Sequence, residues 1–277
     1  MLQVTRHDDV TRLRWSTRTS RAMRFEVSAY LVRGVLVDTG FPAVGEELAR
    51  WAREARPTGA LVTHHHEDHS GNVGRLAALG IPVGSAPETL VRIAHPEPIG
   101  WYRRLCWGSA RPLAQQPEPF SHPALTLLHT PGHSVDHHVV WDAERETIFG
   151  GDLFIGVKVR IAHPGEDIRG QVAVLRRIAA LAPTRFFDAH RGPLERPVEL
   201  LLAKAQWIEE VVGGIERRAA QGWDARAIEA DVLGRGDFTG LISRGDYAKR
   251  NIVESVLAGV GLDRQAGTLS TKPVSAQ

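Results

Sequence analysis

Hydrophobic and polar residues recur with two different periods in the first part of the chain, and these periods predict alternating strands and helices. Residues 25–38 contain two β-rich runs separated at Gly34, which predict a hairpin that ends in the turn "DTG". Residues 43–55 carry apolar residues at helical spacing, with acids early and arginines late, as the helix dipole favours. The run "GALVT" predicts the next strand, and "SGNVGRLAALG" predicts a short helix capped by Ser70.

Strands return after residue 124, and the last part of the chain shows helical patterns alone. The runs "ALTLLHT", "HHVVWD", "ETIFGGD" and "TRFFDAH" predict strands, with one helix at "DIRGQVAVLRRIAALAP". Residues 94–123 are rich in proline, aromatic and basic residues and are too long for a simple connection, which predicts a lid-like insertion. We therefore expect one domain over residues 1–196, a helical extension over 197–262 and a disordered polar tail over 263–277.

The composition is that of an ordinary globular protein, with 43% hydrophobic and 24% charged residues among 277. No apolar run is long enough to span a bilayer, and the first residues, "MLQVTRHDDVTRLRW", lack the apolar segment of a secretory signal, so we expect a cytoplasmic protein. The single cysteine, Cys106, excludes an internal disulfide. A net charge of +2 is too small to favour nucleic acid as a partner.

A cluster of histidines and acids follows the strand "GALVT", and it indicates metal binding. In "THHHEDHSGN" the pattern HxHxDH is formed by His64, His66, Asp68 and His69. Alternate residues that leave a strand point to the same side, so His64 and His66 would share one site while Asp68 and His69 turn to a neighbouring one. Imidazole and carboxylate are ligands that zinc, iron and manganese accept. The alternative is a solvated, histidine-rich loop.

Three further candidate ligands follow later apolar runs: His133 in "TPGHS", Asp152 in "GGDLF" and His190 in "DAHRG". If the strand ends meet at one edge, His133 would complete the site of His64 and His66, and His190 would complete the site of Asp68 and His69. Asp152 would then bridge two metals. A structural role is a stronger alternative for His190 than for the others, because "DAHRGP" differs from the "PGHG" often found there.

The motifs "VDTG", "THHHEDHSGN", "TPGHSVDH", "FGGDLF" and "AHRGP" together resemble the metallo-β-lactamase-fold hydrolase superfamily, over residues 25 to about 195. The resemblance implies an α+β fold, a four-layer αβ/βα sandwich with the metals at one edge of its two sheets, in a catalytic domain of residues 1–196. It implies the same metal ligands, and Asp38 resembles the family's acid that orients a ligand. Within the superfamily, the bridging Asp152 resembles the glyoxalase II branch and its relatives. The motif "PGHSVDH" also resembles a group of hydrolases that includes an endoribonuclease-type member with a small C-terminal domain.

These observations predict a dinuclear zinc-dependent hydrolase, with iron or manganese as other possible metals. Two metals lower the pKa of a water that bridges them, so a bridging hydroxide would attack a small ester, thioester or lactone. Asp68 is the candidate catalytic residue, because it faces that water and would pass its proton to the leaving group. The substrate would be a small molecule, with no membrane partner.

Two other functions stay open. A metal-dependent phosphodiesterase or endoribonuclease is one, although the low net charge argues against it. An iron-dependent dioxygenase or redox protein is the other, although redox members usually carry Glu where this chain has His66. A dioxygenase would require that His69 or His190 does not bind metal.

The lid-like insertion offers residues that would line the substrate site: Trp101, Tyr102, Arg103, Arg104 and Trp107, together with His137 outside the insertion. They would stack bases and pair phosphates, or enclose an acyl chain, or form a simple hydrophobic cover with solvated arginines. In the helical extension, Trp207, Ile208 and Val211 would form either a wall of the substrate pocket or a contact in a homo-oligomer.

Overall fold

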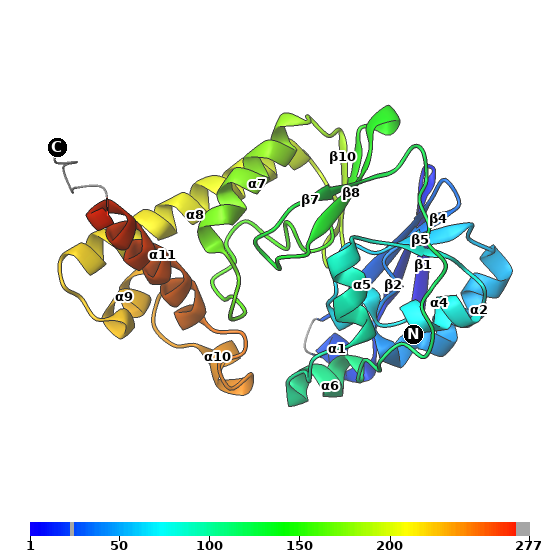
Figure 1. The fold of residues 1–277 in the computed structure, drawn as a ribbon, viewed down its shortest axis with the longest axis horizontal. Coiled ribbons are helices and arrows are strands. Elements are labelled where there is room, and N and C mark those ends of the chain that lie inside the picture. The colour runs from blue at the N-terminus through cyan, green and yellow to red at the C-terminus, as the bar shows by residue number, and fades with distance from the viewer. Residues whose placement is uncertain (23–24, 270–277) are drawn as a thin grey trace, which may run out of the picture.

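The computed structural model describes residues 1–22 and 25–269, with side chains described as far as residue 259. Two β-sheets pack face to face, and helices cover both outer faces (Figure 1). This arrangement confirms the predicted α+β class and the four-layer αβ/βα sandwich. Among the described residues, no helix is both long and apolar enough to cross a membrane.

The first sheet has six strands that follow one another in chain order. They are β1 (Leu2–His7), β2 (Val10–Trp15), β3 (Val27–Val32), β4 (Val35–Val37), β5 (Gly59–Leu61) and β6 (Val83–Gly84). The first four are antiparallel, whereas β4, β5 and β6 are parallel. The sequence analysis predicted the β3–β4 hairpin but not the β1–β2 hairpin.

The second sheet has five strands in the order β11-β10-β9-β8-β7. They are β7 (Thr126–His129), β8 (His138–Asp142), β9 (Thr147–Phe149), β10 (Arg185–Asp188) and β11 (Gly192–Leu194). Only β9 and β10 pair in parallel. Strand β5 runs parallel to its neighbours β4 and β6, and β9 runs parallel to β10. Parallel strands have their carboxyl ends at the same edge of a sheet, so the residues that follow β5, β9 and β10 can meet at one edge of the sandwich.

Neighbouring residues of one strand pack into different cores, as the period of two in a strand requires. In β9, Ile148 packs against helices on the outer face, while Phe149 packs between the sheets. Phe187 of β10 lies on the same inner side, and its ring stacks on Phe149 with 5.3 Å between centroids. The sandwich therefore has an apolar layer between its sheets and one beneath the helices on each side.

Helices of the first half cover the outer face of the first sheet. They are α1 (Arg18–Ala22), η1 (Pro42–Val44), α2 (Gly45–Ala55), α3 (Glu67–Ser70), α4 (Val73–Ala78), α5 (Pro87–Ala94) and α6 (Trp101–Trp107). The prediction of Ser70 as a cap is wrong: α4 begins after Asn72, and Ser70 is the last residue of α3. The lid-like region 94–123 contains α6, and its later part pairs with β6 through the Val83 N–H, which donates to the Glu118 carbonyl.

Helices of the second half cover the outer face of the second sheet and continue into the extension. They are η2 (Ala143–Arg145), α7 (Ile168–Ala180), α8 (Pro197–Ala220), α9 (Ala225–Val232), α10 (Phe238–Ile242) and α11 (Lys249–Leu269). One apolar core joins Leu175 of α7 to Leu201 of α8 and Val256 of α11. The backbone of α11 continues through residues 263–269 of the predicted tail, and residues 270–277 lie outside the described residues.

Candidate metal centre

The seven predicted ligands lie in loops that leave the strands at one edge of the sandwich. His64, His66, Asp68 and His69 follow β5, and the others follow β7, β9 and β10. Their side chains form two adjacent groups, and within each group the candidate ligand atoms lie within 4.8 Å of one another. The structure thus brings together all the residues that the sequence analysis proposed as ligands.

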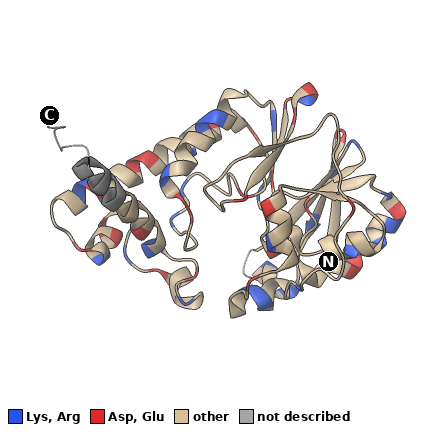
Figure 2. Ribbon diagram, in the orientation of Figure 1, with Lys and Arg blue, Asp and Glu red and all other residues tan. Residues whose placement is uncertain are grey.

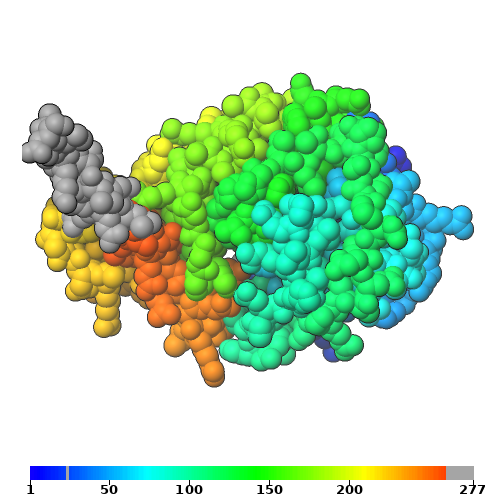
Figure 3. All heavy atoms as spheres, in the orientation of Figure 1, coloured from blue at the N-terminus to red at the C-terminus, as the bar shows by residue number. Residues whose placement is uncertain are grey.

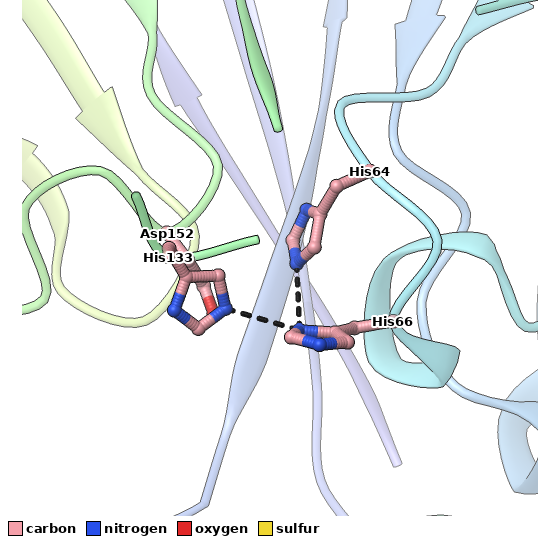
Figure 4. A group of neighbouring side chains, drawn as sticks. All are labelled: His64, His66, His133 and Asp152. Carbon is pink, nitrogen blue, oxygen red and sulfur yellow. Dashed lines mark hydrogen bonds and ion pairs between the residues drawn. The ribbon is translucent and has the colours of Figure 1, made fainter. Parts of the chain in front are cut away.

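The first group consists of His64, His66, His133 and Asp152 (Figure 4). His66 Nδ1 lies 3.0 Å from His64 Nε2 and 3.0 Å from His133 Nε2. Three imidazole nitrogens from two different loops therefore face a common point.

The second group consists of Asp68, His69 and His190. Asp68 Oδ2 lies 3.7 Å from His69 Nε2 and 3.6 Å from His190 Nε2. Burial lowers the pKa of His190, but the Asp152 and Asp68 carboxylates outweigh burial and raise this pKa to about 9. The electrostatic potential of this group is therefore negative, which favours a cation.

Asp152 lies between the two groups and directs one oxygen at each. Its Oδ2 is 3.3 Å from His133 Nε2 of the first group. Its Oδ1 is 3.2 Å from His69 Nε2 and 3.1 Å from His190 Nε2 of the second. A carboxylate in this position can hold two cations at once.

Hydrogen bonds on the far side of the rings direct Nε2 of His190 and His69 at the centre. His190 Nδ1 lies 2.9 Å from the Glu26 carbonyl oxygen, which can only accept, so Nδ1 carries a proton. His69 Nδ1 donates in the same way to Asp38 Oδ2 at 2.8 Å. The facing carboxylates raise the pKa of both rings, so a bound cation would displace the proton on Nε2. Burial lowers the pKa of His64 well below its usual value, so this ring is neutral. Neutral imidazoles with a free Nε2 are the form that binds metal.

Buried polar atoms at this centre test whether metal ions fit. His69 Nε2 and Asp152 Oδ1 are buried and have no hydrogen-bond partner among the described residues, although they approach each other closely. Buried acceptors without a donor cost free energy unless another group binds them. Since all the facing atoms are imidazole nitrogens and carboxylate oxygens, divalent ions such as zinc, iron or manganese fit this centre.

Asp38 contacts the candidate ligand His69, in a position that would suit an acid that orients a metal ligand. It lies at the end of β4 with φ +63°, a left-handed conformation that Asp tolerates better than most residues. Its Oδ1 accepts from the Thr63 amide at 2.8 Å, and its Oδ2 accepts from His69. The carboxylate therefore holds the His69 ring in one orientation.

Two further buried acids support the ligand loops, and the sequence analysis did not identify them. Asp136 accepts from the His65 amide at 2.9 Å and lies 2.7 Å from His65 Nδ1, so it joins the loop after β5 to the loop after β7. Asp188 accepts from the His190 amide at 2.9 Å. The signal in the sequence was an acid close to each later ligand motif, in "GHSVDH" and "FFDAH".

His137 is buried behind the centre. Its Nε2 accepts from the Asp152 amide at 3.0 Å, and its Nδ1 donates to the Thr130 hydroxyl at 2.7 Å. Gly151 leaves room for this contact, because a Cβ there would lie 2.8 Å from His137 Nε2. His137 thus positions the bridging ligand and is not among the residues that line the cavity described next.

A cavity of about 750 Å³ opens onto five of the ligands: His66, Asp68, His133, Asp152 and His190. Of the lid residues, Tyr102 and Trp107 line it. Trp101 and Arg104 are exposed on α6 outside its lining. Arg103 is buried, and its Nε donates to Glu67 Oε1 at 2.7 Å, so it joins α6 to the loop of ligands.

Comparison with known proteins identifies the family. The sequence model of the Metallo-beta-lactamase superfamily matches residues 22–190, which is more than half of the chain. The chain therefore belongs to this superfamily, as the motifs predicted.

Similar curated proteins carry more specific names. A beta-lactamase-like protein 2 homolog of Caenorhabditis elegans is 25% identical over 170 residues, covering 60% of this chain and 54% of that protein. A hydroxyacylglutathione hydrolase of Halorhodospira halophila is 35% identical over 162 residues, covering 56% of this chain and 54% of that protein. An atrochrysone carboxyl ACP thioesterase of Aspergillus chevalieri is 30% identical over 126 residues, covering 44% and 37%. The chain matches about half the length of the first two.

Solved structures support the fold. A metallo-beta-lactamase from Pontibacter korlensis superposes with a TM-score of 0.56 at 18% identity, covering 76% of this chain and 99% of that one. At this identity the likeness concerns the fold alone.

Proposed function

We propose that the protein is a metal-dependent hydrolase of an ester, thioester or lactone, with two divalent ions, zinc first among them. The observation that carries the proposal is the placement of Asp152, whose two oxygens face two separate groups of ligands. Two ions in these groups would lower the pKa of a water and polarise the carbonyl oxygen of a substrate.

Residues of the chain would supply the remaining parts of the reaction. Asp68 lines the cavity, so its carboxylate can reach both a water and the substrate. It would accept the proton of the attacking water and pass it to the leaving thiol or alcohol. Asp38 and His137 would hold His69 and Asp152 in place while this occurs. The largely apolar cavity would exclude bulk water.

The charge distribution favours a carbonyl substrate over a nucleic acid. Figure 2 shows Lys, Arg, Asp and Glu interspersed over the outer helices, without one continuous basic face on the side in view. Among the described residues that line the cavity, the only Lys or Arg side chains are Arg191 and Lys204, and Lys204 already donates to two backbone carbonyls. A polyanion would meet little positive charge here. The named relatives include a hydroxyacylglutathione hydrolase and a thioesterase, which supports the same class.

The test combines metal analysis with a substrate panel. Zinc-loaded protein is expected to hold two ions per chain and to hydrolyse an acyl thioester or a lactone in preference to an activated phosphodiester or a short RNA. Asp68→Asn should abolish this turnover, whereas Asp8→Asn, in the exposed β1–β2 turn, should not change it. Turnover of the phosphodiester or RNA alone would establish a nuclease instead. One iron per chain with consumption of oxygen would establish a dioxygenase.

A further inference from the structure

The helical extension forms one wall of the cavity beside the metal centre. Its apolar residues there are Trp207, Ile208 and Val211 of α8, Phe238 and Ile242 of α10, and Ile252 of α11. All six lie beyond residue 190, where the match to the superfamily ends. This wall is therefore a feature of the chain's own extension.

The opposite side of the cavity is apolar as well. Phe25, Tyr102 and Trp107 contribute from the first half, and Ile155 and Val159 contribute from the segment that follows Asp152. Figure 3 shows a hollow between the cyan segments of the first half and the orange helices of the extension. An occupant would thus be enclosed by apolar side chains from both halves.

Two polar side chains that line the cavity away from the candidate ligands, Lys204 and Gln171, are hydrogen-bonded within the protein. Lys204 donates to the carbonyl oxygens of Leu153 and Phe154 at 2.9 and 2.8 Å. Gln171 donates to Glu166 at 3.2 Å. These groups have few hydrogen bonds left for a ligand, so the body of the occupant must itself be largely apolar.

The volume of the cavity sets the size of that occupant. Sites of roughly 300–1,000 Å³ typically enclose a whole drug-sized ligand. At about 750 Å³, this cavity is far larger than an acetyl group requires. A short acyl group bound at the metals would leave most of the apolar wall uncovered.

We propose that this cavity binds the linear apolar acyl chain of the substrate, so that the substrates are thioesters or esters of medium-length to long fatty acids. The proposal rests on the hydrolase function proposed above. In the reaction, water adds to the acyl carbon and the C–S or C–O bond breaks. The thiol or alcohol leaves with one proton, and the fatty acid remains as a carboxylate with release of a second. Val211, Ile208 and Ile242 then determine chain-length specificity.

The experiment measures kcat/KM of the zinc-loaded protein on thioesters of one small thiol, with acyl chains of increasing length below their micellar concentration. For the wild type we expect kcat/KM to rise about three- to fourfold per added methylene, which corresponds to about 0.8 kcal/mol each, until the cavity is filled. Val211→Trp fills part of the cavity and should lower the ratio of kcat/KM for long chains to kcat/KM for the acetyl thioester at least tenfold relative to the wild type. Leu202→Trp, on the exposed face of the same helix, is the matched control and should keep the wild-type profile.

A second measurement does not depend on turnover. Titration calorimetry of the zinc-loaded protein with fatty acids should show tighter binding for longer chains, with a negative heat-capacity change, and Val211→Trp should weaken it. If short thioesters are hydrolysed and neither rate nor binding depends on chain length, the acyl-chain proposal fails while the hydrolase stands. If no thioester or ester is hydrolysed but fatty acids bind with this dependence, the hydrolase fails while the assignment of the cavity stands. A long-chain preference that Val211→Trp leaves unchanged would also overturn the proposal.

Discussion

The buried ion pair between Arg103 and Glu67 yields a quantitative prediction about stability. Glu67 lies in the chain between two metal ligands, and Arg103 reaches it from α6. Their side chains are only 5% and 4% exposed, and Arg103 Nε lies 2.7 Å from Glu67 Oε1. Arg103→Met keeps most of the apolar volume but leaves a carboxylate buried without its partner. Breaking a buried pair in this way costs about 3–5 kcal/mol.

An exposed pair in the same chain provides the comparison. Arg75 Nη1 lies 2.6 Å from Glu46 Oε1, but the two side chains are 45% and 77% exposed. Solvent screens such a pair, so Arg75→Met should cost at most about 1 kcal/mol. The two pairs have similar N–O distances, but we expect different losses of unfolding free energy because the pairs differ in burial.

Calorimetric melting of both variants tests this reasoning, once their metal content has been shown to equal that of the wild type. At about 2–4 °C per kcal/mol for a chain of this size, Arg103→Met should lower Tm by about 6–20 °C and Arg75→Met by no more than about 4 °C. The double variant Arg103→Met with Glu67→Met removes both buried charges and should regain most of the loss. The reasoning is refuted if Arg103→Met melts no lower than Arg75→Met, or if the double variant melts below the single one.

Three other predictions concern residues that surround the candidate metal centre. Asp38→Asn places an amide donor against the Nδ1 proton of His69, so the affinity for the second metal should fall about 10- to 100-fold in competition with a chelator; unchanged affinity would contradict the orienting role. Gly151 has φ +50°, and a Cβ there would lie 2.8 Å from His137 Nε2, so Gly151→Ala should lower both Tm and metal content. Gly80 is the control: it has φ +73° but nothing within 4 Å of an added Cβ, so Gly80→Ala should lower Tm alone through backbone strain. Burial lowers the pKa of Lys204 to about 8, against 10.5 for the unfolded chain, so the unfolded state binds more protons between these values. Relative to Lys204→Met, the wild type should therefore gain about 3 kcal/mol of unfolding free energy in urea titrations as the pH rises from about 8 to about 10.5, and a constant difference would refute the shift.

The gathering of the candidate ligands at one place could be predicted because each one follows an apolar run closely. A strand leaves its last residues at the edge of a sheet, and that edge is shared by strands far apart in the chain. His64 and Asp152 follow strands of different sheets, so the face-to-face packing of the two sheets brings them together, which the sequence indicates only as a possibility. The first hairpin was not predicted because β1 is an edge strand with no buried residue, so its alternation carries little hydrophobic signal.

The roles of individual side chains in loops were less predictable than the ligand set. The residues after His133 follow turns rather than a strand, so no period indicates that His137 points behind Asp152. Arg103 was expected to line the substrate site or to be a solvated arginine of the lid, whereas it is buried against Glu67, a partner distant in the sequence. In both cases the partner is set by tertiary packing, which local sequence does not encode.

One face of helix α8 contributes to the proposed wall of the substrate cavity and also contacts the segment that follows Asp152. Lys204, Trp207, Ile208 and Val211 stand at positions i, i+3, i+4 and i+7, so they share that face. The last three line the cavity, and Lys204 donates to the carbonyls of the two residues that directly follow Asp152. A substrate chain that shifts α8 would therefore also shift the loop of the bridging ligand. Because α8 shares a core with α7 and the second sheet, the wall packs with the half of the sandwich that carries Asp152 rather than with the half that carries His64.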